Sequence, residues 1–213
     1  MKQKEPFFNV REPSIIWFIG LLTIIHIFQL FVVRQDWFYE SLALFPYGFF
    51  DSSNESFVQL PSLLTHGFLH SDFSHLLMNA GTILIFGLIT FRGVRAKTAK
   101  RQFGFTIFWS IFLLGIVCGG LFQWAEWHLS QTSYISAVGS SGGASTLFAT
   151  AGWAIGGRDS LLKFTLVFIV LNVLMVFTLG NIAWAAHAGG FIFGALMAPY
   201  WVKPLNPNPS IRR

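Results

Sequence analysis

Six long runs of apolar residues dominate the chain, and short polar segments separate them. The runs cover residues 15–33, 68–91, 103–123, 138–157, 161–179 and 182–202. Each run, wound as a helix at about 1.5 Å per residue, can cross the roughly 30 Å of hydrocarbon in a bilayer. No internal repeat or low-complexity linker interrupts the pattern. The pattern therefore predicts an all-α polytopic membrane protein, with one bundle of six transmembrane helices over residues 15–203.

The composition excludes a soluble domain. Hydrophobic residues make up 54% of the 213 residues and charged residues only 11%, whereas soluble domains carry about 25% charged residues. So few charges cannot cover so much apolar surface in water. The single cysteine, Cys118, lies inside an apolar run, so it forms no internal disulfide and matches no metal-binding spacing. We therefore expect no metal site.

The basic residues indicate how the chain is oriented. If the N-terminus is cytoplasmic, 13 of the 14 Lys and Arg residues fall on the cytoplasmic side, and only Arg34 falls on the other. These 13 are Lys2, Lys4, Arg11, Arg92, Arg95, Lys97, Lys100, Arg101, Arg158, Lys163, Lys203, Arg212 and Arg213. The positive-inside rule therefore predicts both termini in the cytoplasm, as an N-terminal segment (1–14) and a C-terminal tail (204–213). The net charge of +5 then reflects orientation in a lipid bilayer and gives no reason to expect a nucleic-acid partner.

The second apolar run opens with polar residues that are costly in a membrane. His75 and Asn79 are four residues apart, so they share one helix face and can both donate hydrogen bonds from it. An interhelical polar clamp would explain this pair equally well. Asp72, or the serine before it, is expected to cap the start of the helix. We expect a structural part for His70 and an interfacial position for His66.

The fourth and sixth runs carry further candidates. The fourth opens with AVGSSGGAST, and a helix that starts there leaves backbone N–H groups free to stabilise an oxyanion. The sixth contains His187 in AAHAGGFIFGALMA, followed by a GxxxG face formed by Gly190 and Gly194. Small residues also serve close helix packing, which is the expected role of the GxxxG face. Such packing would bring His187 near the helix that docks there.

Three of these polar residues are predicted to lie at a similar depth. Counted to the first cytoplasmic basic residue of its own helix, His75 is 17 residues away, Ser141 is 17 and His187 is 16. At about 1.5 Å per residue, each lies roughly 25 Å from the cytoplasmic boundary, toward the outer face. Unrelated structural groups need not be level, whereas a site assembled from three helices must be. We therefore expect one site near the outer face.

Nucleophilic acyl transfer is the chemistry that fits these side chains. A serine needs a base to take its proton, and a neutral histidine suits that role. His75, Asn79 and a backbone N–H of the serine segment can form an oxyanion hole. No acidic residue in the apolar runs is placed to orient His187, so we expect a Ser–His dyad in preference to a triad.

Three ordered motifs resemble those of the rhomboid family of intramembrane serine proteases. FLHSDFSHLLMN is similar to the family's histidine–asparagine motif, GSSGG to its GxSG nucleophile motif, and AHAGGFIFGALMA to its histidine and GxxxG motif. Their order, spacing and topology resemble the six-helix bacterial form over residues 15–203. The resemblance implies an enzyme of a bacterial cytoplasmic membrane that cleaves transmembrane segments of other proteins near the outer face. It also implies that no metal or organic cofactor takes part.

The resemblance further implies roles for particular residues. Ser141 would be the nucleophile and His187 the general base, with His75 and Asn79 supporting the oxyanion. Gly139 would precede the nucleophile in the GxSG turn, and the two glycines of the GxxxG face would let the sixth helix pack tightly on the fourth. The fifth helix and the loop after it would move to admit substrate.

Ser145 departs from the family pattern. An aromatic residue often stands four positions after the nucleophile in this family and packs on the catalytic histidine, whereas this chain has a serine there. Ser145 is also an alternative nucleophile, although the downstream pattern and the depth favour Ser141. A catalytically inactive relative that binds membrane clients is therefore the alternative function. A small transporter is a third class, but no charged residue lies deep in an apolar run, as a transporter would need.

Overall fold

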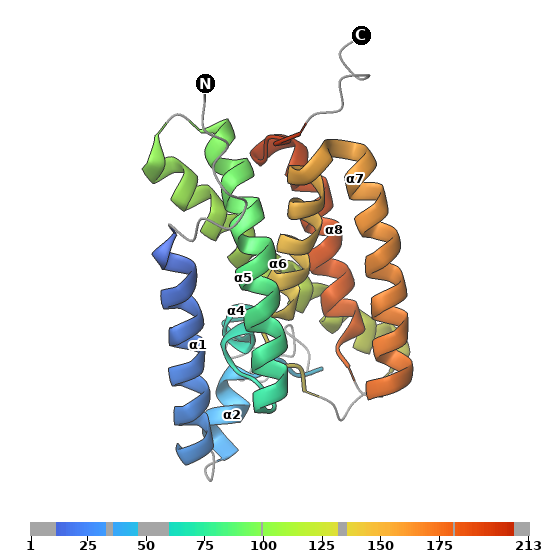
Figure 1. Cartoon of the computed structure of the whole chain (residues 1–213). Helices are drawn as coiled ribbons and strands as arrows, with labels where there is room; N and C mark the ends of the chain where they lie inside the picture. The colour runs from blue at the N-terminus through green and yellow to red at the C-terminus, as the bar shows by residue number, and fades with distance from the viewer. Residues whose placement is uncertain are drawn as a thin grey trace.

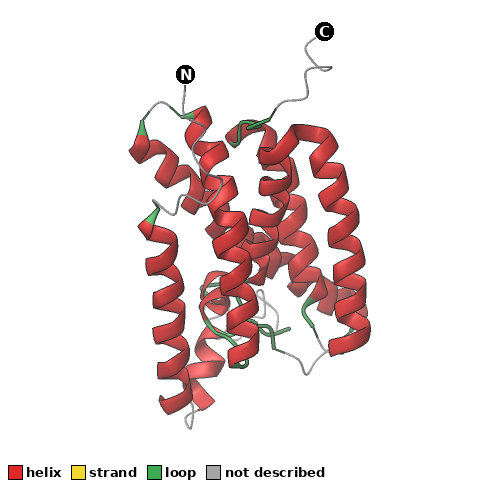
Figure 2. Ribbon diagram, in the orientation of Figure 1, coloured by secondary structure: helices red, strands yellow, loops and turns green. Residues whose placement is uncertain are grey.

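The computed structural model of the chain describes residues 12–32, 36–46, 60–98, 100–131, 136–180 and 182–206. Its long helices run up and down beside one another in one bundle (Figures 1 and 2). The helices are α1 (Pro13–Val32), α2 (Asp36–Leu42), α4 (Ser62–Thr65), the 3-10 turn η1 (His66–Phe68), α5 (Phe73–Lys97), α6 (Arg101–Ser130), α7 (Ser141–Leu179) and α8 (Trp184–Trp201). Extended pairing within the described ranges is limited to one bridge, between Leu44 and Ala137. The fold is therefore all-α, as the apolar runs predict.

Four helices of the described residues are long and apolar enough to cross a membrane, namely α1, α5, α6 and α7. Of the predicted terminal segments, residues 1–11 and 207–213 lie outside the described residues.

The start of α5 differs from the predicted start of the second run at residue 68. The helix begins at Phe73 because Asp72 is its N-cap, with an extended backbone and a side chain that accepts the N–H of His75 at 2.9 Å. The four residues before the helix, 69–72, form an irregular segment after η1 with a bend at 71–72. The polar segment that carries His70 is thus a loop, which the apolar pattern alone does not distinguish from helix.

The fourth and fifth predicted runs are joined in α7, which has a break in its middle. Gly156 and Gly157 have non-helical backbone angles, and Gly157 has a φ of 68° that favours glycine. The break divides α7 into a first arm (141–155) and a second arm (158–179) that returns alongside it (Figure 1). No residue of 158–180 is buried, which fits a helix with one face on the bundle and the rest toward lipid.

Glycines bring the backbones of three helices close together where α6, α7 and α8 meet. A Cβ built at Gly119 would lie 2.8 Å from the carbonyl oxygen of Ala186 and 3.1 Å from Cα of Gly142. One built at Gly190 would fall on the carbonyl oxygen of Gly142, and one at Gly194 would lie 2.6 Å from the carbonyl oxygen of Thr146. The first arm of α7 therefore packs backbone to backbone between its neighbours.

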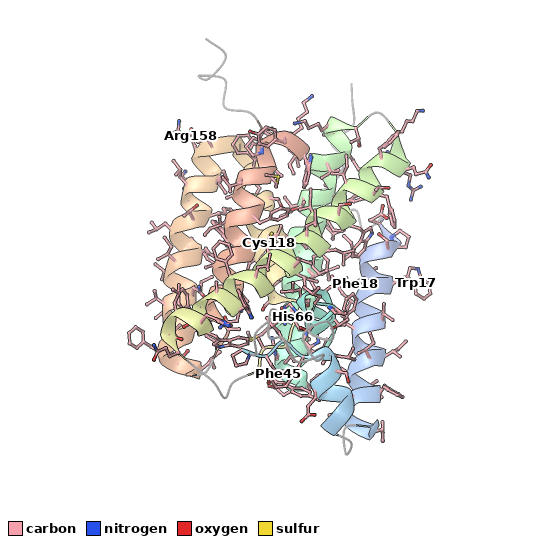
Figure 3. The ribbon with its side chains drawn as sticks, turned by 180° about the vertical axis from the view of Figure 1, so that it is seen from behind. Trp17, Phe18, Phe45, His66, Cys118 and Arg158 are labelled. Atoms are coloured by element: carbon pink, nitrogen blue, oxygen red, sulfur yellow. The ribbon has the colours of Figure 1, made fainter. Side chains whose placement is uncertain are left out.

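Basic residues gather at one end of the bundle. Arg158 lies at that end, opposite His66 and Phe45 (Figure 3). The chain after α8 is fixed there by the N–H of Lys203, which donates to the carbonyl of Gly93 at 3.0 Å. The loops that precede α5 and α7 lie at the opposite end.

Candidate active site

One cavity of about 660 Å³ lies among α5, both arms of α7 and the start of α8. Of the residues singled out in the sequence, it is lined by Ser141, Ser145, His187, His75 and Asn79. The lining also includes Asn172, on the second arm of α7. Neither His70 nor the three glycines Gly139, Gly190 and Gly194 line it. The structure thus brings the candidate reactive groups of three helices onto one space.

The turn before α7 depends on Gly139. Its φ of 119° is rarely adopted by residues with a side chain. A Cβ at this position would lie 2.6 Å from Cε1 of His75 and 2.7 Å from its Nε2. The N–H of Gly139 donates to the carbonyl of His66 at 2.9 Å. Gly139 therefore lets the serine loop lie directly against the His75 ring.

The two adjacent serines point into different surroundings. Ser140 is fully buried, and its hydroxyl lies 3.5 Å from Nε2 of His70. Although it is the N-cap residue of α7, its side chain makes no capping bond. Ser141, the first residue of the helix, lines the cavity instead. The first turn of α7 therefore presents a serine hydroxyl together with backbone N–H groups that no side chain caps.

A short relay links His75 to Asp72. The Ser71 hydroxyl lies 2.9 Å from Oδ2 of Asp72 and 3.1 Å from Nδ1 of His75. When Ser71 donates to Asp72, it accepts Nδ1–H of His75, so Nε2 donates to an oxyanion only if His75 carries a second proton. When Ser71 instead donates to Nδ1 of His75, the ring hydrogen of a neutral His75 lies on Nε2, which can then donate to an oxyanion. Hydrogen bonds from Ser74, from the His75 backbone and from Ser71 lower the pKa of the Asp72 carboxyl well below its usual range.

Asn79 faces the same cavity from one turn further along α5. One of its amide hydrogens goes to the carbonyl of His75, with Nδ2 at 3.1 Å from that oxygen. The amide has a second hydrogen, which this bond does not use. His75 and Asn79 therefore offer two side-chain donors beside Ser141.

His187 lies in the first turn of α8, and two side chains from other helices hold this turn. The N–H of Ala186 donates to Oε1 of Gln123, on α6, at 3.2 Å. Nδ1 of His187 lies 3.0 Å from Oδ1 of Asn172. No hydrogen bond joins His187 to Ser141 among the contacts of these two described residues. Both side chains line the same cavity, and catalytic hydrogen bonds often form only when substrate is bound.

The contact between α7 and α8 has a polar member that the sequence analysis missed. The hydroxyl of Thr146 donates to the carbonyl of Gly190 at 2.6 Å, and Thr146 is fully buried. Thr146 lies within the GxxxG contact, since its backbone faces Gly194 and its hydroxyl reaches Gly190, but in the sequence it stood out only as part of a stretch of small residues. This bond adds a directional link to the close approach of the two helices.

His70 connects α1 to the serine loop. Its backbone N–H and carbonyl both pair with the side chain of Gln29, at 3.2 and 2.9 Å. The ring of His26, also on α1, lies 6.3 Å from the ring of His70, which lies 5.2 Å from that of His75. His26 is 2% exposed, and neither of its ring nitrogens has a hydrogen-bond partner. The sequence signal for His26 was a lone histidine in the first apolar run.

Two buried histidines before α5 make the stability of the protein depend on pH. His66, expected at the interface, is 2% exposed, and its Nδ1 lies 2.7 Å from the carbonyl of Ser62. Burial lowers the pKa of His66 to about 4. Burial, with His75 and His26 nearby, lowers the pKa of His70 to about 3. Both rings are therefore neutral in the folded protein at pH 5 to 7.

We expect the unfolding temperature in detergent to fall as the pH is lowered from 7 to 4.5. In the unfolded chain both groups take up protons near about pH 6.5, so that state binds more protons below this pH and gains stability. The stability gained by burying two neutral rings is complete above about pH 6.5 and is lost progressively as the pH falls to about 4 for His66 and about 3 for His70. Replacing both residues (His66→Gln with His70→Gln) should flatten the dependence, whereas replacing the exposed His128 (His128→Gln) should not. An equal slope in the double variant and the wild type would contradict this account.

Among the described residues, no three His, Cys, Asp or Glu side chains gather in a way that could hold a metal ion. The polar side chains that line the cavity include the Ser141 hydroxyl, the imidazoles of His75 and His187, and the amides of Asn79 and Asn172.

Comparison with protein families gives a clear match. The family model described as Rhomboid domain matches residues 58–204, well over half of the 213-residue chain. The matched range covers all the motif residues and both arms of α7. Comparison with curated proteins gives no match. The resemblance drawn from the three motifs is confirmed, and the chain belongs to the rhomboid family.

Proposed function

We propose that the protein is an intramembrane serine endopeptidase that cleaves transmembrane segments of other membrane proteins. The observation that carries the proposal is the shared cavity, which gathers Ser141, His187, His75 and Asn79 from three helices. Packing alone does not require a hydroxyl, two imidazoles and an amide to face one space. Membership of a family whose members are usually intramembrane serine proteases supports the same conclusion.

In this mechanism His187 takes the proton of the Ser141 hydroxyl through Nε2, and Oγ attacks the carbonyl carbon of the peptide bond. The oxyanion receives hydrogen bonds from Nε2 of His75, Nδ2 of Asn79 and backbone N–H groups of the first turn of α7. His187 then gives the proton to the leaving amine. Water hydrolyses the acyl-enzyme with His187 again acting as the base.

The shape of the cavity supports a helical substrate. Along α5 its lining runs from Asp72 to Phe86, a distance of about 21 Å at 1.5 Å per residue. The opposite wall is the second arm of α7, including Phe168 and Met175. Polar side chains lie at the Asp72 end, where water must reach the acyl-enzyme, and apolar side chains line the other end. The substrate bond must leave its helix to react, so residues of weak helix propensity near it would favour cleavage.

We propose that both termini are cytoplasmic and that the site faces the outer side of a bacterial cytoplasmic membrane. The basic end of the bundle supports this orientation under the positive-inside rule. At that end Nζ of Lys97 donates to the carbonyl of Pro199 at 2.8 Å, and Arg101 lies 3.9 Å from Glu12. The two arms of α7 together with α1, α5, α6 and α8 make six spans in this arrangement.

The proposal is tested with purified protein in liposomes. We expect the wild type to cut a single-span test protein with glycine and proline near its outer face, and to react with a fluorophosphonate probe. His187→Ala should lose both reactions, because the serine then has no base. Thr178→Val should keep both, since among the described residues this exposed hydroxyl bonds to the carbonyl of Leu174 of its own helix alone. A wild type that neither cuts nor labels would favour the client-binding alternative.

A further inference from the structure

Asn172 is the one polar residue in the stretch 166–177 of the second arm of α7. An amide in such an apolar helix is costly unless it is hydrogen-bonded. Both ends of this amide have partners on α8: Oδ1 lies 3.0 Å from Nδ1 of His187, and Nδ2 donates to the carbonyl of Trp184 at 3.4 Å. The amide therefore bridges the second arm to the first turn of α8.

The carbonyl of Trp184 determines which way the Asn172 amide faces. A carbonyl oxygen can only accept, so the nitrogen end of the amide must point to Trp184. The oxygen end then points to His187, and an oxygen can only accept the hydrogen on Nδ1. Turning the amide over would place two oxygens against each other at Trp184.

This orientation of the amide selects the ring form of His187 that can act as a base at Nε2. A neutral histidine carries one ring hydrogen, and the bond to Asn172 places it on Nδ1. Nε2 then has a free electron pair, which is what a base needs to accept the proton of Ser141. With the hydrogen on Nε2 instead, the ring could not take that proton.

We propose that Asn172 is a positioning residue that holds His187 in the Nδ1–H form and fixes the plane of its ring. It acts through His187 and does not touch the reacting atoms. The inference deepens the proposed function and rests on it. It replaces the simple dyad expected from the sequence with a Ser–His pair that a third, neutral side chain orients.

Asn172→Leu tests this role because leucine has a similar size and no acceptor. We expect kcat for a transmembrane substrate to fall on the order of 10²-fold with KM within about twofold, since a misplaced ring hydrogen harms only the chemical step. Asn172→Asp keeps an acceptor oxygen and should restore kcat to within about tenfold of the wild type. Thr178→Val, on the same arm and outside the cavity, should leave kcat unchanged. Equal kcat in Asn172→Leu and the wild type would overturn the proposal.

The form of the ring can be measured without catalysis. In protein labelled with ¹⁵N-histidine, we expect the His187 resonances, assigned by their loss in His187→Ala, to report hydrogen on Nδ1. Asn172→Leu should move them toward the Nε2–H form, and Asn172→Asp should not. An unchanged ring form in Asn172→Leu would overturn the proposal even if kcat fell. If the ring form changes as expected but the wild type does not cleave, the positioning role holds and the proposed function fails.

Discussion

Ser141→Ala is expected to lower cleavage of a transmembrane substrate by at least about 10³-fold and to abolish fluorophosphonate labelling. The alanine removes the only atom that forms the acyl bond, while the backbone of α7 is kept. Ser141 is the first residue of that helix, so its hydroxyl and the uncapped N–H groups lie in one turn. Within the described residues the Ser141 hydroxyl makes no hydrogen bond that the alanine would remove, so the unfolding temperature should stay near that of the wild type.

Ser145→Ala is the matched variant, because Ser145 lies one turn further along the same face and lines the same cavity. We expect it to retain cleavage to within about tenfold, since it leaves the serine of the Gly139 turn in place. Activity in Ser141→Ala with loss in Ser145→Ala would assign the nucleophile to Ser145.

Gly190→Ala is expected to lower the free energy of unfolding by about 3 kcal/mol or more. It should also reduce the rate of cleavage, because it moves His187 away from its place in the site. The added methyl group would fall on the carbonyl oxygen of Gly142, a backbone atom that cannot turn aside. α7 and α8 must then separate, and they carry Ser141 and His187 within one turn of this contact. Unfolding in detergent and cleavage rates measure the two effects.

Gly81→Ala is the control, because a Cβ at Gly81, on α5, would meet nothing within 4 Å. Replacing a helical glycine by alanine without a clash is expected to be neutral or stabilising by up to about 1 kcal/mol. Similar free energies of unfolding for Gly190→Ala and Gly81→Ala would show that the close contact of Gly190 with Gly142 does not stabilise the protein.

Much of the fold follows from features that act locally. Apolar runs of the right length predict helices, and the capping aspartate Asp72 marks the start of α5 more accurately than the apolar pattern does. The end of α6 was harder to predict. The helix continues to Ser130, beyond the predicted limit of the third run at residue 123, through residues that include Glu126 and His128. Polar residues at a helix end carry little hydropathy signal, and α6 ends only at Gln131, whose backbone is left-handed with a φ of 56°.

The site was predictable to the extent that depth and residue type restrict it. Similar distances from the basic end predict that Ser141, His187 and His75 lie at one depth, and all three line one cavity. Asn172 was not identified from the sequence. Its partner His187 lies on the next helix, beyond a loop, and neither the depth comparison nor the distribution of charges draws attention to a neutral amide. An acidic residue is the usual partner that orients a catalytic histidine, and Asn172 is neutral. A single amide in a long apolar stretch was the available signal.

Because α7 is broken at Gly156 and Gly157, a small change of angle there produces a large displacement at the far end of its second arm. Asn172 stands 15 residues beyond Gly157, which is about 22 Å along the helix. A rotation of about 10° at the break would displace Asn172 by about 4 Å, far beyond the range of a hydrogen bond. Under the proposed role of Asn172, the angle between the two arms of α7 at this break therefore decides whether the Asn172–His187 hydrogen bond can form. Substitutions that stiffen or skew this joint would alter turnover without touching the cavity.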